Sequence, residues 1–441
     1  MHKVLVANRG AIARRIVRTC QAQGLQSVAV FSTADAGAPH LDEATEAFSL
    51  PGHTPAETYL NQELLLDIAK RAGVDAVHPG YGFLAESASF AQSVIDAGLI
   101  FIGPKPQWLA RMGDKVTARE LMAAHNFPVF PGSKLIETNA QATDMASAIG
   151  YPIMVKPSGG GGGMGMFVVH GEEQLVEAVQ RAKAVAASAF GNDGVYLERF
   201  IEQPRHIEYQ ILGDGRGNAM HMFERDCSIQ RRNQKLIEES PAPGLSPEWL
   251  LQQATLAAGT CAQLGYDNLG TMETLVAKSG EVGFLEMNTR IQVEHGVTEA
   301  ITGCDLIALQ IELAQGGTLP SMPVREGFAM EVRLYAEDPL TLLPSTGKLQ
   351  IFRPPNLFGV RVETGYREGQ TISPYYDAML AKLIAHGQTR EMTIGRLLVA
   401  LRAFEVVGVK TNAPLLMKIL HYPAFLAGEV HTGIVEQVLG E

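Results

Sequence analysis

Residues 286–294 read Glu-Met-Asn-Thr-Arg-Ile-Gln-Val-Glu, with a polar side chain at every second position. Successive side chains of a β-strand point to opposite faces, so this spacing predicts a strand with Met287, Ile291 and Val293 on its buried side. The other face would carry an acid, an amide, a cation, an amide and an acid, which are Glu286, Asn288, Arg290, Gln292 and Glu294.

A second strand adds another carboxylate to that face. Thr271–Val276 and Gly283–Asn288 are predicted to form a hairpin, which would place Glu273 beside Glu286. Carboxylate and amide oxygens are ligands that Mg²⁺ accepts where it bridges nucleotide phosphates. The two acids and Asn288 are therefore candidate metal ligands.

Two groups further along the same face suit a small anion and its proton. The forked guanidinium of Arg290 matches a planar anion, and the carboxylate of Glu294 could act as a base. An exposed amphipathic strand with neutralising charges is the simpler alternative. The alternation of acid, amide, cation, amide and acid, beside Glu273 on the paired strand, favours a functional site over this alternative.

A run of five glycines, Gly159–Gly163, lies between two predicted strands. Successive glycines let backbone N–H groups surround phosphate oxygens without side-chain clash, and Lys156 would add a positive charge at the base of the loop. A flexible linker is the alternative, but the apolar flanks favour a loop that covers phosphate. The run is not a Walker A loop, because Gly-Lys-Ser/Thr does not follow it.

Two other segments are less specific. Glu224–Lys235 contains three cations within five residues, which could hold bicarbonate or phosphate, although a solvated charged loop is the simpler interpretation. His78–Glu86 follows an apolar strand and carries two glycines and a proline. Turn geometry explains that loop about as well as ligand contact does.

The first part of the chain alternates strands with helices, which implies a parallel sheet covered by helices on both faces. The predicted strands are Val4–Ala7, Ser27–Phe31, Ala76–His78 and Leu99–Ile102. The predicted helices are Ala11–Gln23, Gln62–Ala72 and Ser87–Ala97. Asn8-Arg9-Gly10 would then lie where a doubly wound sheet places a ligand loop.

Three regions follow. Met112–Val129 reads as one helix and a link. A small α/β unit is predicted next, with strands Pro152–Lys156, Met166–His170 and Val195–Phe200 and a long helix that ends at Phe190. A hairpin of Ile207–Leu212 and Ala219–Glu224 then precedes a C-terminal region with strands Met330–Tyr335, Leu349–Phe352, Gly359–Glu363 and Ala381–Ile384 and a helix Met392–Ala403.

Composition narrows the class of protein. The 441 residues allow about three domains, and 46% hydrophobic with 19% charged residues fits a globular chain. The net charge of −11 disfavours nucleic-acid binding. The four cysteines form neither a metal-ligand spacing nor a disulfide framework. The apolar runs are too short for a membrane helix, and the first residues lack the apolar stretch of a signal peptide. We therefore expect a cytoplasmic protein.

Together these segments resemble the biotin carboxylase family of the ATP-grasp superfamily over essentially the whole chain. The segments that carry the resemblance are Ala7–Gly10, His78–Leu84, Met112–Lys115, Lys156–Met166, Glu224–Lys235, Pro241–Gly244, Glu286–His295, Ala336–Pro339 and Pro374–Asp377. The resemblance implies an α/β ATP-grasp fold with five parts. These are an N-terminal doubly wound parallel-sheet domain (1–111), a linker helix (112–130), a mobile lid (131–202), a catalytic core (203–329) and a C-terminal α+β domain (330–441).

The resemblance also implies a site for ATP and Mg²⁺ or Mn²⁺. Glu273, Glu286 and Asn288 would bind the metal. The residues expected around the nucleotide are Lys115, Lys156, Gly161, Gly162, Gly163, Met166, Glu198, Arg199, Ile201, His206, Gln230, Asn233 and Leu275. The family often has Lys in place of Arg199, a change that is tolerable if only the backbone contacts adenine.

Bicarbonate and biotin are the implied co-substrates. Bicarbonate would be held by Lys235, Arg290, Gln292, Glu294 and the backbone of Val293, and biotin by Tyr81, Gly82 and Arg333. In the implied reaction Glu294 removes the bicarbonate proton, and bicarbonate attacks the γ-phosphorus to give carboxyphosphate. Carboxyphosphate breaks to CO₂ and phosphate, phosphate takes the ureido proton of biotin, and Arg333 stabilises the biotin enolate.

The implied partners are a biotin carboxyl carrier protein or domain, a carboxyltransferase and a second copy of the chain in a homodimer. Leu416–Ile419 is the nearest string to a biotinylation site, but its helical pattern predicts an ordinary helix, so the carrier is expected on another domain or subunit. Met164, Asn233 and Gly296 are similar to urea carboxylases, whereas Gly113–Lys115 resembles acyl-CoA carboxylases. The final carboxyl acceptor therefore stays open.

Two other functions fit part of these observations. Another ATP-grasp ligase that forms an acylphosphate would share the lid and the metal acids, but would not need Arg333 or the loop at Tyr81. A catalytically degenerate paralogue would bind ATP and regulate a partner. A Rossmann dehydrogenase is disfavoured because residues 8–13 lack Gly-x-Gly-x-x-Gly.

Overall fold

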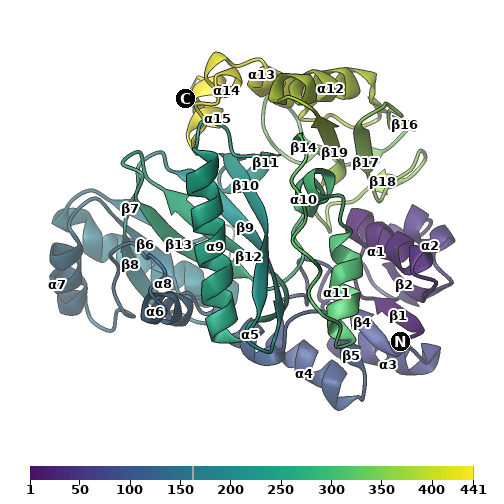
Figure 1. The fold of residues 1–441 in the computed structure, drawn as a ribbon, viewed down its shortest axis with the longest axis horizontal. Helices are drawn as coiled ribbons and strands as arrows, with labels where there is room; N and C mark the ends of the chain where they lie inside the picture. The colour runs from purple at the N-terminus through teal and green to yellow at the C-terminus, as the bar shows by residue number, and fades with distance from the viewer. Residues whose placement is uncertain (161–162, 441) are drawn as a thin grey trace.

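The computed structural model describes residues 1–160 and 163–440. Figure 1 shows an N-terminal unit at the right, a three-stranded unit at the left, an eight-stranded sheet between them and C-terminal helices at the top. This arrangement matches the predicted α/β fold with an N-terminal parallel sheet.

The N-terminal unit is a parallel sheet of order β3-β2-β1-β4-β5. Its strands are β1 (Lys3–Val6), β2 (Gln26–Ser32), β3 (Glu46–Leu50), β4 (Ala76–His78) and β5 (Ile100–Phe101). Its helices are α1 (Gly10–Ala22), η1 (Thr33–Asp35), α2 (Pro39–Glu43), α3 (Gln62–Ala72) and α4 (Ala88–Asp96). The predicted strands and helices are all present, with each end within one residue of the prediction.

Sequence periodicity did not reveal β3, because this edge strand buries only Leu50 fully. The loop after β1 meets the loop after β4, as the topology requires. The side chain of Asn8 donates to the carbonyls of Pro79 at 2.7 Å and Tyr81 at 2.8 Å. Asn8 therefore fixes the loop that begins at His78.

The region after β5 differs from the single helix that we predicted from Met112. It contains two helices, α5 (Pro106–Gly113) and α6 (Lys115–Ala124). Asp114 separates them because its backbone is extended and its carboxylate accepts from the amide of Thr117 at 2.7 Å. An N-cap aspartate starts the second helix at Lys115.

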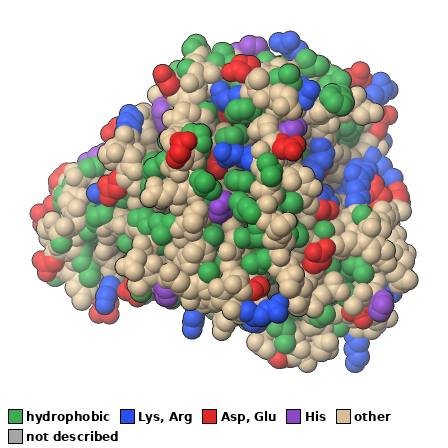
Figure 2. Space-filling view, viewed as in Figure 1, with side chains coloured by type: hydrophobic (Ala, Val, Ile, Leu, Met, Phe, Trp, Pro, Cys, Tyr) green, Lys and Arg blue, Asp and Glu red, His purple; other side chains and the backbone are tan. Residues whose placement is uncertain are grey.

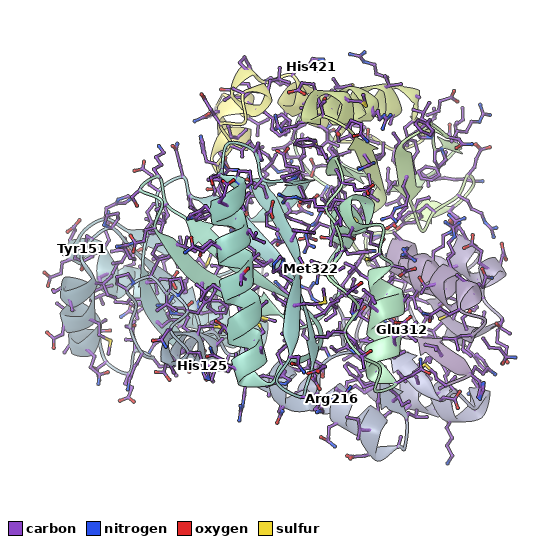
Figure 3. The ribbon with its side chains drawn as sticks, in the orientation of Figure 1. His125, Tyr151, Arg216, Glu312, Met322 and His421 are labelled. Carbon is purple, nitrogen blue, oxygen red and sulfur yellow. The ribbon has the colours of Figure 1, made fainter. Side chains whose placement is uncertain are left out.

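The three-stranded unit is antiparallel, with order β7-β6-β8. It comprises α7 (Asn139–Ile149), β6 (Ile153–Pro157), β7 (Phe167–Val169), α8 (Glu172–Phe190) and β8 (Val195–Arg199). The glycine loop joins β6 to β7, and its Gly161 and Gly162 lie outside the described residues. Tyr151 marks the outer end of this unit in Figure 3.

The eight-stranded sheet has the order β13-β12-β9-β10-β11-β14-β19-β17, and every neighbouring pair is antiparallel. Its first five strands in sequence are β9 (Arg205–Asp214), β10 (Ala219–Arg231), β11 (Gln234–Ser240), β12 (Asp267–Val276) and β13 (Val282–Asn288). Helix α9 (Pro247–Leu264) packs on β9 and β10 and lies across them in Figure 1. Both predicted hairpins are present.

The charged stretch Glu224–Lys235 is a hairpin and not a solvated loop. Strand β10 continues to Arg231 and β11 begins at Gln234, with Arg232 and Asn233 in a turn at φ 48° and 64°. Most of its charges, those of Glu224, Arg225, Asp226 and Arg231, are buried, whereas Arg232 in the turn is exposed. Arg225, for example, donates to Glu208 on β9 at 2.7 Å.

The C-terminal region shares the large sheet through β14 (Phe328–Tyr335), β17 (Val360–Glu363) and β19 (Met379–Gly387). Short pairs are formed by β15 (Gly347–Lys348) with β18 (Thr371–Ile372) and by β16 (Ile351–Arg353) with β20 (Glu405–Val407). The helices are α10 (His295–Thr302), α11 (Leu306–Ala314), α12 (Arg390–Ala403), α13 (Ala413–Leu420), α14 (Pro423–Leu426) and α15 (Ile434–Leu439). Met322 marks the connection from α11 to β14 in Figure 3. Lys418 lies in helix α13, as predicted.

Backbone pairing of β11 with β14 crosses the predicted domain boundary at residue 330. The five predicted domain ranges stay predictions. On the face shown in Figure 2, acidic and basic side chains are interspersed among apolar ones. Within residues 1–160 and 163–440, each helix is too short or too polar to cross a bilayer.

Candidate active site

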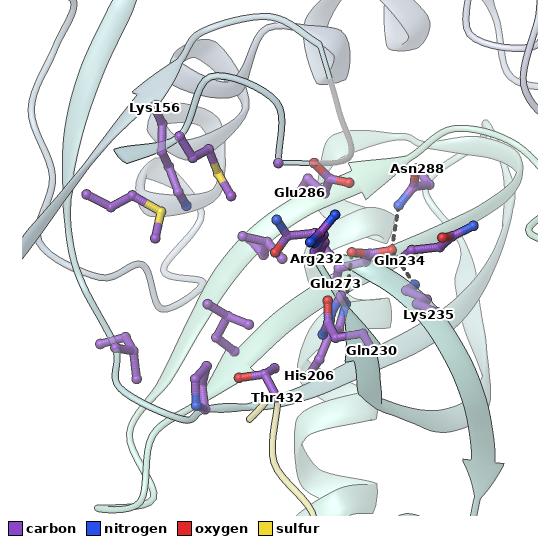
Figure 4. A pocket seen from close by; sticks show the side chains of 18 of the residues that line it. Lys156, His206, Gln230, Arg232, Gln234, Lys235, Glu273, Glu286, Asn288 and Thr432 are labelled. Carbon is purple, nitrogen blue, oxygen red and sulfur yellow. Dashed lines mark hydrogen bonds and ion pairs between the residues drawn. The ribbon is translucent and has the colours of Figure 1, made fainter. Parts of the chain in front are cut away.

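A pocket of about 480 Å³ lies between the three-stranded unit and the eight-stranded sheet. It gathers most of the predicted site residues, namely Lys115, Lys156, Gly163, Met166, Glu198, Arg199, Ile201, His206, Gln230, Asn233, Lys235, Glu273, Leu275, Glu286, Asn288, Arg290, Gln292, Val293, Glu294 and Arg333. In Figure 4, Lys156 reaches into the pocket from β6, opposite Glu273 and Glu286 on the large sheet. Groups far apart in sequence therefore face one cavity.

The segment 286–294 brings its polar groups into the pocket by a different route from the one predicted. Strand β13 ends at Asn288, and residues 289–294 form an irregular turn that leads into α10. The turn leaves the sheet because Glu86 of the N-terminal unit accepts from the amide of Thr289 at 3.2 Å and from Arg290 Nε at 2.8 Å. Met287 and Ile291 are buried as expected, but Val293 lines the pocket and is only half-buried.

Glu273 and Glu286 are direct cross-strand partners on β12 and β13. Glu273 accepts from Lys235 at 2.8 Å, from Asn288 at 2.9 Å and from Gln292 at 2.8 Å through one carboxylate oxygen. Burial alone would raise the pKa of Glu273, but Lys235 and His206 hold it well below its usual value. This carboxylate is ionised and faces the cavity.

Lys235 connects three carboxylates at the base of the pocket. Its ammonium lies 2.6 Å from Glu208, 2.8 Å from Glu273 and 2.7 Å from Glu294. Burial would lower the pKa of Lys235, but the carboxylates of Glu208, Glu273 and Glu294 raise it well above the usual value. Lys235 is therefore a fixed positive charge between two acids predicted to act on metal and bicarbonate.

Glu294 is held between two cations. Its oxygens accept from Lys235 Nζ at 2.7 Å and from Arg333 Nη2 at 2.9 Å, and the residue is 2% exposed. Burial would raise the pKa of Glu294, but Lys235, Arg333 and Arg225 together lower it well below the usual range. Glu294 is an ionised carboxylate and can accept a proton from a bound acid.

Arg333 is fixed on its other side by Glu238, whose carboxylate accepts from Nε at 2.6 Å. Glu238 lies on β11 directly opposite Glu331 on β14, and both side chains are fully buried. Burial raises the pKa of Glu238 to about 7, with Arg333 opposing the rise. Glu238 was not among the residues predicted from the sequence, because its role depends on its cross-strand neighbours.

Arg225 is a second residue that sequence reasoning did not single out. It is fully buried, and its guanidinium donates to the side chains of Glu208, Gln210, Thr298, Thr271 and Gln292. The bond to Gln292 Oε1 is 2.5 Å, while Gln292 Nε2 donates to Glu273 at 2.8 Å. Arg225 therefore fixes the orientation of the Gln292 amide, with Oε1 toward Arg225 and Nε2 toward Glu273.

The side of the pocket opposite the large sheet is built from the three-stranded unit and the start of α6. Lys156 Nζ lies 2.6 Å from Glu198, whose other oxygen accepts from Arg119. Lys115 lies 3.2 Å from Glu286. The Glu198 side chain therefore positions Lys156. Arg199 pairs with Glu281 at 2.5 Å.

Two further contacts lie in the pocket. His206 Nε2 lies 2.9 Å from Glu273, and Glu273 raises the pKa of His206 against the effect of burial. Asn233, at the tip of the β10–β11 turn, lies against Gly163. A Cβ atom placed on Gly163 would come within 2.0 Å of the Asn233 amide nitrogen. The glycine permits the loop to reach the turn.

Tyr81 and Gly82 do not line this pocket within the described part of the chain. They lie in the loop that Asn8 holds, with Tyr81 half-buried and Gly82 exposed. Burial raises the pKa of Tyr81, as do Glu363 and Asp377, whereas Arg333 acts in the opposite direction.

The pocket also contains residues without a recognisable signal in the sequence. Thr432 comes from the turn before α15, and its amide donates to the carbonyl of Pro204 at 3.0 Å. Other unpredicted lining residues are Met154, Phe200, Gln203, Pro204, Gln234 and Leu285, whereas Arg232 belongs to the predicted cation cluster. Only the fold brings the C-terminal Thr432 to this pocket.

This geometry defines a class of enzyme. A small antiparallel unit with a glycine loop and a lysine closes over a large antiparallel sheet that carries paired acids, which is the ATP-grasp arrangement. Three family models match in order: biotin carboxylase N-terminal domain at 1–109, carbamoyl-phosphate synthase L chain ATP-binding domain at 114–322, and biotin carboxylase C-terminal domain at 331–437. The chain belongs to the biotin carboxylase family.

Relatives and solved structures agree. Biotin carboxylase 2 of Bacillus subtilis is 47% identical, over 99% of this chain and 99% of that protein. A biotin carboxylase from Campylobacter jejuni, solved with β-γ-ATP, has a TM-score of 0.96 and 38% identity over 99% of this chain and 98% of that one.

The biotin carboxylase domain dimer of Hydrogenobacter thermophilus 2-oxoglutarate carboxylase, solved with MgADP, ADP and bicarbonate, has a TM-score of 0.95 and 43% identity over 99% of this chain and 97% of that one. The predicted enzyme class, an ATP-dependent biotin carboxylase, is confirmed at the level of the family.

Proposed function

We propose that the pocket uses ATP to activate bicarbonate and that it passes the carboxyl group to biotin on a separate carrier domain or subunit. The observation that carries this proposal is the placement of Glu294. It is ionised, buried and held between Lys235 and Arg333, in the same cavity as the cross-strand acids and the lysine of the glycine loop. A proton acceptor, an anion site and a nucleotide site therefore share one enclosed space.

Lys115 and Lys156 would bind the phosphates of ATP, and the glycine loop would cover them with backbone N–H groups. Both lysines are now paired with acids, at 3.2 Å to Glu286 and 2.6 Å to Glu198. Phosphate oxygens would compete for the same ammonium groups. The adenine would lie between Leu275, Ile201 and the backbone at Arg199, which line the outer part of the pocket.

The residues at the phosphate end fit Mg²⁺. Glu273 and Glu286 offer hard oxygen ligands from neighbouring strands, and Asn288 lies beside them. The partners of Glu273 keep it ionised, as a metal ligand must be. Bound Mg²⁺ would neutralise charge that develops on the transferring phosphoryl group.

Bicarbonate would bind between Arg290, Lys235, Gln292 and the backbone at Val293. Glu294 would take the bicarbonate proton while a bicarbonate oxygen forms a bond to the γ-phosphorus and ADP leaves. The low pKa of Glu294 keeps it deprotonated before binding. The negative charges of ATP and bicarbonate would raise that pKa toward the value a general base needs.

The resulting carboxyphosphate would break to CO₂ and phosphate within the closed pocket, because water would destroy it. Phosphate would then accept the N–H proton of the biotin ureido ring, and the ring nitrogen would attack CO₂. Arg333 would stabilise the negative charge on the ureido oxygen, since its guanidinium stays charged at any working pH. Tyr81 and Gly82 would hold biotin from the side of the N-terminal unit.

A carrier protein, a carboxyltransferase and a second copy of this chain are the proposed partners.

We place the protein in the cytoplasm, because its cysteines are free and three of the four are buried. Another ATP-grasp ligase remains the rival function, since it would use the same lid and acids.

ADP release with bicarbonate and Mg²⁺, measured with and without free biotin, tests the proposal. We expect biotin to stimulate turnover and Glu294→Gln to lower it about 100-fold or more. Arg333→Lys should lower carboxybiotin formation more than ADP release, whereas Glu63→Gln on the exposed face of α3 should match the parent. ADP release that biotin does not stimulate would favour the rival ligase, and ATP binding without ADP release would favour a degenerate paralogue.

A further inference from the structure

Two leucines project into solvent from the loop that follows β14. Leu340 is 88% exposed and Leu343 is 63% exposed, in a loop that spans residues 338–346. Exposed apolar side chains such as these are candidates for contact with a partner.

The loop is held in shape by polar contacts at its base. Asp338 accepts from the amides of Leu340 at 2.8 Å and Thr341 at 3.2 Å, and its other oxygen pairs with Lys410 at 2.5 Å. A β-bridge joins Glu337 to Pro344. The two leucines are therefore presented on a preformed loop, which lowers the conformational cost of binding a partner.

The loop forms one wall of a cavity of about 560 Å³ that is adjacent to the active-site pocket. The β10–β11 turn lies between the two spaces, because Arg232 and Gln234 line both of them. Tyr335 lines the cavity two residues after Arg333 on β14, so both side chains point to the same side of the strand. Burial raises the pKa of Tyr335, and Arg333 counteracts the rise.

We propose that Leu340 and Leu343 dock the protein domain that carries biotin, and that its biotinyl arm passes through this cavity to Arg333. The inference rests on the proposed function, in which biotin arrives covalently attached to a protein. A carrier domain cannot enter a pocket of this size. It must rest on the rim from which its arm reaches Arg333, and the rim beside Tyr335 is where the leucines project. Exposed apolar anchors next to a polar cavity match the anatomy of such interfaces.

Carboxylation kinetics with three kinds of biotin test this docking surface. The substrates are free biotin, biotinyl-lysine amide, and biotinylated carrier domains from an acetyl-CoA carboxylase, a pyruvate carboxylase and a urea carboxylase. The variant is Leu340→Asp with Leu343→Asp in the full chain. The matched control is Leu251→Asp with Leu426→Asp, which changes two leucines that are 52% and 49% exposed on α9 and α14.

We expect the parent to use at least one carrier domain with a lower KM than biotinyl-lysine amide. The loop variant should raise that KM by about tenfold or more, with kcat/KM for free biotin within about twofold of the parent. The control variant should leave both values unchanged. Biotinyl-lysine amide should behave like free biotin, because it has the arm without the domain.

Other results would contradict the inference in distinguishable ways. An unchanged KM for the carrier domain, or a parent that prefers no carrier domain to biotinyl-lysine amide, overturns the docking surface alone. An equal loss with free biotin would mean that the loop supports the active site itself. Dissociation of a dimer by the loop variant with unchanged carrier kinetics, seen by light scattering, would assign the leucines to a second copy of the chain. Absence of biotin-dependent turnover in the parent would instead overturn the proposed function.

Discussion

Glu86 ties the N-terminal unit to the arginine proposed to bind bicarbonate, so its replacement tests how that arginine is positioned. One Glu86 oxygen accepts from Arg290 Nε at 2.8 Å and the other from the amide of Thr289 at 3.2 Å. Arg290 is also held by Asn288 Oδ1 at 2.8 Å. Removing the Glu86 charge therefore loosens Arg290 without releasing it.

The expected size of the change in the KM for bicarbonate follows from how far solvent reaches the Glu86–Arg290 pair. The Glu86 side chain is 40% exposed and that of Arg290 is 20% exposed, so solvent screens the pair, and its contribution falls in the range of about 0.2–1 kcal/mol. That range corresponds to about 1.4- to 5-fold in affinity. We expect Glu86→Gln to raise the KM for bicarbonate by about this factor, and Glu86→Ala, which loses both contacts, to raise it further. The kcat should stay within about twofold.

Initial rates of bicarbonate-dependent ADP release at saturating ATP measure this effect, with thermal midpoints as a check on folding. Glu63→Gln, on the exposed face of α3 in the same unit, is the matched control. Glu86 also adds negative charge near the anion site, which opposes bicarbonate. If Glu86→Gln lowers the KM for bicarbonate, that repulsion outweighs positioning and the reasoning is refuted.

Two further predictions concern buried charges. Arg225→Met should lower the free energy of unfolding by about 3–5 kcal/mol in urea titrations, because it leaves Glu208 Oε1 buried without its cation while Lys235 still pairs with the other oxygen, and Arg225→Lys should recover only part of that loss. Burial raises the pKa of Glu238 from 4.5 to about 7, so the folded chain binds a proton that the unfolded chain has released, and stability from this group falls as pH rises between those values. Glu238→Gln should therefore flatten the decline in unfolding free energy between about pH 5 and about pH 8; an unchanged slope would contradict this assignment.

The sequence predicted which groups form the site better than it predicted how they reach it. Alternation at 286–294 indicated the correct polar residues, because each of them lines the pocket. The strand nevertheless ends at Asn288, since Glu86 diverts the chain by bonds that span about two hundred positions. Local periodicity carries no information about such a tether.

Hairpins and helices were predictable where the signal was local. The two predicted hairpins and the N-terminal helices match because turn residues and apolar spacing specify them. The β10–β11 hairpin was missed because its strands carry buried charges, whose pairing with β9, β14 and C-terminal residues depends on the fold. The edge strand β3 was missed because it has little apolar alternation, and Thr432 because no pattern surrounds it.

The charged pairs of the pocket fall into two groups: an inner tier of buried pairs and an outer tier of partly exposed pairs. This division explains how the site can keep a fixed geometry and still accept a ligand. In the inner tier, Arg225, Lys235 and Arg333 are bonded to fully or almost fully buried acids, where loss of one partner is costly. In the outer tier, Lys115 lies 3.2 Å from a partly exposed Glu286, and Arg290 pairs with the exposed Glu86. Solvent weakens these outer pairs, so phosphate or bicarbonate oxygens can replace the acids at small cost. The inner tier therefore fixes the geometry of Glu294, and the outer tier holds the cations that we propose exchange their carboxylate partners for substrate oxygens.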